Sequence, residues 1–264
     1  DESFSGPYVD YPVYTEPVEW RGQKVPDVIR SGNHAAMTAW RQEQAIEKTV
    51  KNHFTWLRSQ RLSAQDKLSV QKYIPKHYVA LMHADVLIGP ERQPGVTSVT
   101  SIDVHDIARS STTYGVEQFF VVTPLKDQQR IVGTLLDFWQ KGIGVEYNRG
   151  RHEAVDRVRL KNSLTDVIGA IEAQEGKKPV VVTTSAGTHG HANLISYTDQ
   201  HLVWAHDSPV LLIFGTGKAV SESVIHQSDY LLFQIHGFSN FNHLSVRSAV
   251  AIVLDRWLGI HEKI

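Results

Sequence analysis

Two turns near the C-terminus carry the residue types best suited to small-molecule chemistry. The apolar segment 209–214 runs directly into the glycine-rich turn 215–218, whose sequence is Gly-Thr-Gly-Lys. A second apolar segment, 230–235, leads through Gly237 into the polar run 241–245. Strands of an open α/β sheet expose backbone amides and carbonyls at their carboxyl ends, where ligands usually bind. The two turns therefore predict one small-molecule site.

The Gly-Thr-Gly-Lys turn does not fit either common nucleotide motif. A phosphate-binding P-loop needs a Gly five residues before the final Gly-Lys pair and a Ser or Thr after it, but Leu212 and Ala219 occupy these positions. Val220 stands where the dinucleotide fingerprint has its third Gly. A plain turn at the end of a strand remains the alternative to a ligand site.

A pair of histidines, His189 and His191, could suggest a metal ion. They have no Cys or carboxylate pattern nearby, so a solvated loop is the favoured interpretation and we expect no metal. None of the 14 His residues lies in a His-Glu-x-x-His pattern, which leaves zinc hydrolysis without support.

Two serines and one arginine could also take part in chemistry. Neither Ser185 nor Ser245 lies in Gly-x-Ser-x-Gly, so a hydroxyl that caps a helix or contacts a ligand is favoured over a nucleophile. Arg109 belongs to a segment with helical spacing of its apolar residues, 103–115. Judged on these residues alone, Arg109 is expected to form a surface ion pair.

Composition limits the class of protein. The 264 residues are 41% hydrophobic, which is enough for one substantial core and a small second unit. No apolar run approaches the roughly 20 residues that span a bilayer, so we expect a soluble protein without a membrane partner. The absence of Cys fits a cytoplasmic location. The net charge of -1 means that any nucleic-acid binding must use local patches.

The elements that must position these residues alternate between strand and helix from about residue 76. Five short apolar segments predict strands, at 78–82, 118–122, 179–183, 210–214 and 230–233. Four longer segments predict helices, at 104–113, 128–140, 153–173 and 242–258. This alternation predicts an α/β fold with a mostly parallel sheet covered by helices on both faces.

The first 75 residues differ in composition and pattern from the rest of the chain. Four prolines within residues 1–30 favour an extended segment. The run 31–33 can cap a helix that begins at His34, and Ser63 with Asp66 predicts a second helix start. We therefore expect a small helical domain at 1–75, followed by an α/β domain at 76–264.

Three runs in the larger segment carry a resemblance to a known family. Residues 103–122, which begin Asp-Val-His-Asp-Ile-Ala-Arg, resemble the first motif of the SPOUT RNA methyltransferases, especially their TrmH/SpoU branch. Residues 211–217 resemble the second motif and residues 242–252 the third. The likeness extends to an uncharacterised RNA methyltransferase family marked by Tyr-Asn-Arg, here at 147–149, and by the run at 241–247.

The N-terminal segment has its own resemblance. The runs at 2–4, 14–17 and 31–36 are similar to the C-terminal domain of the TrmD family, which methylates N1 of the guanosine 3′ of the tRNA anticodon. That family's cofactor domain would precede residue 1, and its catalytic Asp stands where this chain has Glu2. The resemblance implies a tRNA-contacting role for residues 1–75.

The SPOUT resemblance implies a fold, a cofactor and a reaction. Its sheet ends in a deep C-terminal trefoil knot whose loops hold S-adenosylmethionine, and its TrmH branch methylates ribose 2′-hydroxyls. The implied cofactor-binding residues are Thr183, Thr184, Ser185, Phe214, Gly215, Thr216, Gly217, Ile235, Gly237, Asn242 and Leu244. Arg109 matches the catalytic arginine of the first motif, and Ser245 matches a serine of the third. This chain departs from the branch at His243, where Asn is common, and at 216–217, where Asn-Glu is common.

The resemblance also implies partners. We expect tRNA as the substrate, with RNA contacts from Tyr147, Asn148, Arg149, Arg151 and His243, and a homodimer formed through the knot region. For the arginines, a solvated helix face is the alternative. For the whole chain, the alternative is a non-catalytic domain that binds cofactor or tRNA and assists a TrmD-type enzyme.

Overall fold

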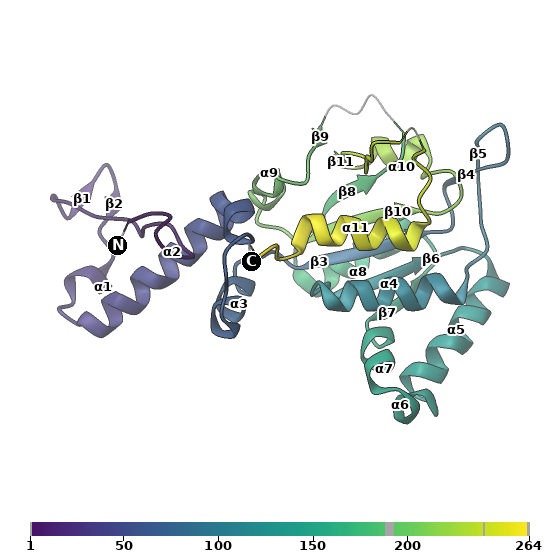
Figure 1. The fold of residues 1–264 in the computed structure, drawn as a ribbon, viewed down its shortest axis with the longest axis horizontal. Coiled ribbons are helices and arrows are strands. Elements are labelled where there is room, and N and C mark those ends of the chain that lie inside the picture. Colours follow the sequence, from purple (N-terminus) through teal and green to yellow (C-terminus); the bar gives the residue numbers. More distant parts are fainter. Residues whose placement is uncertain (1, 188–192, 240, 263–264) are drawn as a thin grey trace. The chain divides into compact units, whose positions relative to one another are not determined.

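The computed structural model describes residues 2–187, 193–239 and 241–262 and is shown in Figure 1. Its backbone forms two compact units. One consists of Asp1–Ile74 together with Ile260–Ile264, and the other of Pro75–Gly259.

The smaller unit is mostly helical. It contains the hairpin of β1 (Glu19–Trp20) and β2 (Gln23–Lys24), the short α1 (Asp27–Arg30), the long α2 (His34–Leu57) and α3 (Ala64–Gln71). The two predicted helix starts are confirmed. The Asn33 side chain accepts a hydrogen bond from the Ala36 amide, and Ser63 forms a reciprocal capping box with Asp66. The Tyr8 hydroxyl donates to the Asp66 carboxylate at 2.7 Å, which fastens the extended N-terminal segment to α3.

The larger unit is built on a seven-stranded parallel sheet, so the predicted α/β architecture is confirmed. The strand order is β7-β6-β3-β10-β8-β11-β9, with β10 beside both β3 and β8. The bounds are β3 His77–Met82, β6 Gln118–Val122, β7 Val158–Lys161, β8 Val180–Thr184, β9 Leu194–Ile195, β10 Val210–Gly215 and β11 Tyr230–Leu232. A separate antiparallel hairpin pairs β4 (Val86–Ile88) with β5 (Gln93–Gly95).

Two predicted helices differ from the structure. The segment 153–173 is not one helix but the end of α7 (Arg149–Val155), strand β7 and the start of α8 (Leu164–Glu175). Val158 is buried against the sheet and pairs with Phe119, while Ser163 starts a new helix through a capping box with Asp166. The predicted helix 242–258 is shorter, because α11 begins at Val246 and residues 242–245 form a loop.

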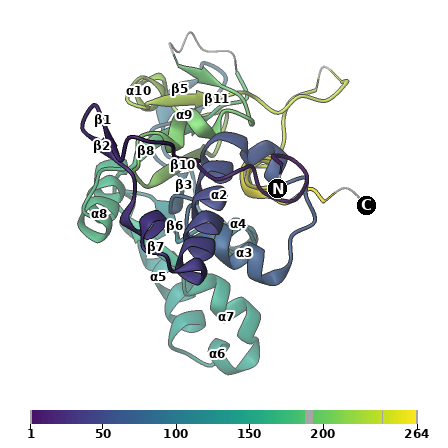
Figure 2. The same ribbon diagram turned by 90° about the vertical axis from the view of Figure 1, so that its left-hand side faces the viewer.

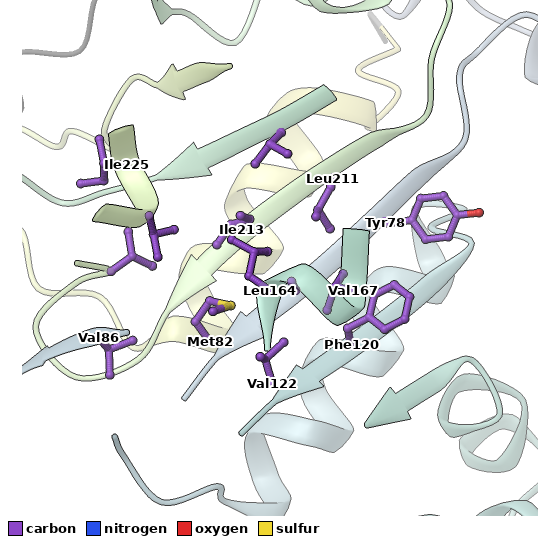
Figure 3. Close-up of a cluster of buried hydrophobic side chains, with 14 of the residues drawn as sticks. Tyr78, Met82, Val86, Phe120, Val122, Leu164, Val167, Leu211, Ile213 and Ile225 are labelled. Atoms are coloured by element: carbon purple, nitrogen blue, oxygen red, sulfur yellow. The ribbon is translucent and has the colours of Figure 1, made fainter. Parts of the chain in front are cut away.

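Helices cover both faces of the sheet. On one face α8 and α10 (Glu222–His226) pack against alternate side chains of the central strands, and Figure 3 shows this buried cluster around Met82, Phe120, Ile213 and Val167. On the other face α4 (Ser101–Thr113) contacts β6, and α11 (Val246–Leu258) contacts both β10 and α4 (Figure 1). The remaining helices are α5 (Lys126–Gln140), α6 (Gly144–Tyr147) and α9 (Gln200–Trp204). Apolar surface buried on both faces is what a parallel sheet requires.

Within the described ranges, no helix combines the length and the apolar character needed to cross a membrane.

Among the described residues of the larger unit, His77 and His83 are buried. The Trp257 indole N–H donates to His77 Nε2 at 3.0 Å, so the proton of His77 lies on Nδ1, which donates to the Pro75 carbonyl at 2.6 Å. Burial lowers the pKa of His77 to about 4, against the opposing effect of the Pro75 hydrogen bond. Burial likewise lowers the pKa of His83 to about 4, although Asp103 and the backbone at Ser98 act in the opposite direction.

These pKa values predict acid destabilisation of the larger unit. Below a pH of about 6.5, the imidazole of His77 is protonated in the unfolded chain but stays neutral in the folded chain. The free energy of unfolding that is present above this pH is therefore lost as the pH falls toward 4. Between about pH 7.5 and about pH 5.5, each buried histidine should lower the free energy of unfolding by about 1 kcal/mol. Urea denaturation of H77Q should show a smaller decrease than wild type. The same exchange at exposed His226 is the control, and equal decreases in H77Q and wild type would contradict the assignment.

Candidate functional site

The parallel register brings several loops to one edge of the sheet. Val210 of β10 lies beside His77 of β3 and beside Val180 of β8, so these strands run in step toward their carboxyl ends. The loops that follow β8, β10 and β11 line a common cavity of about 740 Å³, within the larger unit. This volume lies in the usual range for small-molecule sites.

Most of the predicted cofactor-binding residues line this cavity. They are Thr184, Ser185, Phe214, Gly215, Thr216, Gly217, Ile235, Asn242 and Leu244. Ser245, predicted as catalytic, and His243, predicted to contact RNA, line it as well. The structure therefore brings together residues from three segments that are well separated in sequence.

Thr183 and Gly237 do not belong to the lining formed by the described residues. Thr183 is fully buried, and its hydroxyl is hydrogen-bonded to the Ser228 hydroxyl beneath the loops. Gly237 is exposed in the loop after β11. Thr183 is therefore a buried residue of β8 that does not contact the cavity.

The loop after β10 is held by a chain of hydroxyl groups. Thr216 Oγ1 donates to the Met82 carbonyl at 2.8 Å, so the 2.5 Å contact between Thr97 and Thr216 has Thr97 as the donor. Thr97 can then accept from His83 Nδ1, 3.2 Å away. His83 is neutral because burial lowers its pKa. A neutral imidazole with its proton on Nδ1 can donate this hydrogen bond to Thr97.

An ion pair that the sequence did not suggest also lines the cavity. Arg247, in the first turn of α11, lies 3.1 Å from the carboxylate of Asp103, in the first turn of α4. Asp103 also accepts from Thr100 Oγ1 at 2.5 Å, and Asp106 lies 3.6 Å from Arg247 Nε. The pair ties the start of α4 to the start of α11 and places opposite charges at the wall of the cavity. Both residues stand in the runs that carry the family resemblance, but spacing gave no sign that they meet.

Arg109 lies elsewhere. Its exposed side chain lines a shallow groove between α4 and α11 with Asp106, Tyr114 and Ser248, and it does not line the cavity formed by the loops. Arg247 contributes to both surfaces. Within one chain, the structure does not bring the predicted catalytic arginine to the predicted cofactor site.

The predicted RNA-contacting residues 147–151 form a separate surface. They lie on α6 and α7, which gather with α5 in both views of the molecule (Figures 1 and 2). Tyr147 is exposed, and Asn148 caps α7 by accepting from the Arg151 amide at 3.0 Å. The guanidinium of Arg151 stacks over the Trp139 ring at 4.9 Å, a geometry typical of a cation–π contact.

Metal ligands do not cluster in the described part of the chain. No group of three or more His, Cys, Asp or Glu residues there could hold a metal ion. His189 and His191, the pair that could have suggested one, lie outside the described residues.

A cavity bounded by loops at the carboxyl edge of a parallel sheet is the ligand site of an α/β domain. Residues 76–259 match the family model described as SAM-dependent RNA methyltransferase. The chain belongs to this family of SAM-dependent RNA methyltransferases. Residues 1–58 match a second model, described as tRNA (Guanine-1)-methyltransferase TrmD.

Individual proteins are similar over much of the chain. A tRNA (guanine-N(1)-)-methyltransferase of Nitratidesulfovibrio vulgaris is 39% identical over 98% of this chain and 61% of its own length. An uncharacterised protein of Aquifex aeolicus is 35% identical over 68% of this chain and 86% of its own length. Among solved structures, a probable methylase family protein from Haemophilus influenzae Rd KW20 aligns at 16% identity over 70% of this chain and 65% of that chain, with a TM-score of 0.46. The chain spans about three fifths of the length of the first curated relatives it matches.

The chemistry of the cavity fits S-adenosylmethionine. The cofactor is a sulfonium with an adenine ring, and the lining offers apolar side chains such as Ile235 and Leu244 together with hydroxyl, amide and backbone groups. The carboxylate of Asp103, paired with Arg247, lies at the wall. Gly217 keeps the loop after β10 in a left-handed conformation, with φ +64°, where a Cβ would lie 2.8 Å from the Leu87 carbonyl oxygen.

Replacing Gly217 should therefore damage the site. G217A should lower the free energy of unfolding by more than about 1 kcal/mol, because the Cβ meets both backbone strain and a fixed carbonyl. Exposed Gly169 in α8 has open space around its Cα, so G169A should instead stabilise the protein by about 0.5–1 kcal/mol. Thermal unfolding of the two variants measures the contrast. A G217A protein as stable as wild type would show that the loop is not held as described.

Proposed function

We propose that this chain methylates tRNA at a ribose 2′-hydroxyl. The observation that supports this proposal is the convergence of three loops on one cavity in a chain of the SAM-dependent RNA methyltransferase family. In the reaction, the acceptor oxygen would release its proton to solvent and form a bond to the methyl carbon, while the bond from that carbon to sulfur breaks and the sulfur keeps the electron pair. S-adenosylmethionine supplies the methyl group and leaves as S-adenosylhomocysteine.

The chain's own residues would act mainly by positioning. The loops 183–187, 214–217 and 235–244 would hold the adenosyl group, and Ser245 would face the acceptor with His243 beside it. Holding acceptor and methyl group in line and in contact removes much of the entropic barrier to transfer. A C-terminal trefoil knot that closes these loops is part of the proposal.

Arg109 would act across a homodimer. It lies in the groove between α4 and α11, away from the cavity of its own chain. A second copy docked on α4 and α11 would bring its Arg109 toward the first chain's cavity, because Arg247 links the groove to the cavity wall. Closed two-fold pairs use the same patch on both chains, as this arrangement requires.

Part of the RNA would be held by surfaces outside the cavity. Tyr147 and Arg149 are exposed, and an aromatic ring beside arginines can stack on bases while binding phosphates. We propose residues 1–75 as a separate tRNA-contacting domain and 76–264 as the methyltransferase domain, in keeping with the TrmD match. The names of the relatives support a tRNA substrate, and with it we propose a cytoplasmic location.

A second candidate function comes from departures in the motifs. His243 and residues 216–217 differ from the TrmH pattern, and residues 1–58 match the TrmD model. The chain could therefore bind cofactor or tRNA without transferring a methyl group and assist a TrmD-type enzyme.

Methyl transfer to unmodified tRNA separates the two functions. The chain is incubated with tritiated S-adenosylmethionine and an unmodified tRNA pool, and the nucleosides are then identified by mass spectrometry. The proposal expects a ribose 2′-O-methylated nucleoside. Binding of both ligands without transfer would favour the assisting role, and a base-methylated product would overturn the 2′-O assignment.

Arg109→Ala should abolish transfer and leave the affinity for S-adenosylmethionine within a few-fold of wild type, since Arg109 does not line the cavity of its own chain. R130A is the matched control, because Arg130 is also a helical arginine, paired with Asp127 on α5.

A mixing experiment tests whether Arg109 acts in trans. R109A is combined with S185W, which fills the cavity but keeps Arg109. A mixed dimer would contain one intact site, so transfer should reappear. No recovery despite demonstrated subunit exchange would contradict action across the dimer.

A further inference from the structure

A hairpin joins the rim of the cavity to the loop after β10. The Leu87 amide donates to the Ala219 carbonyl at 2.8 Å, and the Lys218 amide donates to the Leu87 carbonyl at 3.0 Å. Val86 forms a bridge with Val220, and the Ser221 amide donates to the Asp85 carbonyl at 2.7 Å. The hairpin of β4 and β5 is therefore an extension of the loop that faces the cofactor cavity.

This hairpin contributes a positively charged side chain to the lining of the cavity. Arg92, in the turn between β4 and β5, lines the cavity together with Lys218 of the attached loop. Both side chains belong to exposed residues. The nearby acidic residues of the hairpin are Asp85 and Glu91, and neither forms an ion pair with them.

Arg92 and Lys218 differ in their ion pairing from Arg247, which also lines the cavity. Arg247 is paired with Asp103, whereas Arg92 and Lys218 form no ion pair with any residue in 2–187, 193–239 or 241–262. Two cations that line one cavity, and that no carboxylate of the described residues neutralises, are suited to an anionic ligand. Because the chain as a whole carries a net charge of -1, attraction of a polyanion must come from such local patches.

We propose that Arg92 and Lys218 bind phosphate groups of the RNA next to the nucleotide that enters the cavity. This inference rests on the proposed function. The exposed position favours a polyanion over the single carboxylate of the cofactor, because an exposed ion pair contributes little, while each phosphate neutralised on a nucleic acid also releases condensed counterions. The rigid connection of the hairpin to the loop after β10 would fix the phosphate relative to the cofactor.

The test compares R92Q, K218Q and the double variant with K178Q. Lys178 is exposed, forms no ion pair with any residue of the described ranges, and precedes β8 at the opposite edge of the sheet. Binding of an unmodified tRNA transcript is followed by fluorescence anisotropy over a series of salt concentrations. Binding of S-adenosylmethionine is measured by calorimetry.

The double variant should bind tRNA about tenfold or more weakly at low salt, and the slope of log Kd against log salt should fall by about 1 to 2, as expected for two lost phosphate contacts. Its affinity for S-adenosylmethionine should stay within a few-fold of wild type, and K178Q should match wild type in both assays. Unchanged tRNA binding in the double variant would overturn the inference. So would a loss of cofactor affinity with unchanged tRNA binding, which would assign the two cations to the cofactor carboxylate.

This outcome is separable from the proposed function, because binding is measured without methyl transfer. A wild-type chain that binds tRNA through these residues but transfers no methyl group would sink the proposed function alone. A wild-type chain that does not bind tRNA at low salt would overturn the inference.

Discussion

The pairing of β10 with β3 and β8 is the constraint on which the site depends. The strand is buried on both faces, and a shift of one residue would turn its whole set of side chains to the other side. The register therefore fixes where the loops after β8 and β10 emerge. Once that edge is set, short hydrogen bonds from Thr216 and from the hairpin at Leu87 need only hold the loop in place.

The same geometry explains why the proposed role of Arg109 requires two chains. The strand ends assemble a cavity, but the helices that cover the sheet carry Arg109 to a different surface. Arg247 and Asp103 connect the two, since their ion pair joins the starts of α11 and α4 beside the cavity. The proposed dimer on this helical face is the arrangement that would bring an arginine of one chain to the cavity of the other.

Much of this arrangement could be predicted from local sequence. Five apolar segments predicted central strands, and glycines at strand ends predicted where the loops lie, because both signals depend on neighbouring residues. Strand β7 was missed, since its alternation merges with flanking helices and only pairing with β6 defines it. The contact between Asp103 and Arg247 could not be predicted, because 144 residues separate them and only the packing of α4 on α11 brings them together. The position of Arg109 in the groove between α4 and α11 could not be predicted either, because it depends on the same helix packing.

A crystal structure of the chain with S-adenosylhomocysteine tests the cofactor site most directly. We expect the adenosyl group in the cavity lined by the loops after β8, β10 and β11, with Gly217 beside it and Asp103 at the wall near the sulfur. Electron density for the ligand at any other place, or an empty cavity at saturating ligand, would contradict this assignment.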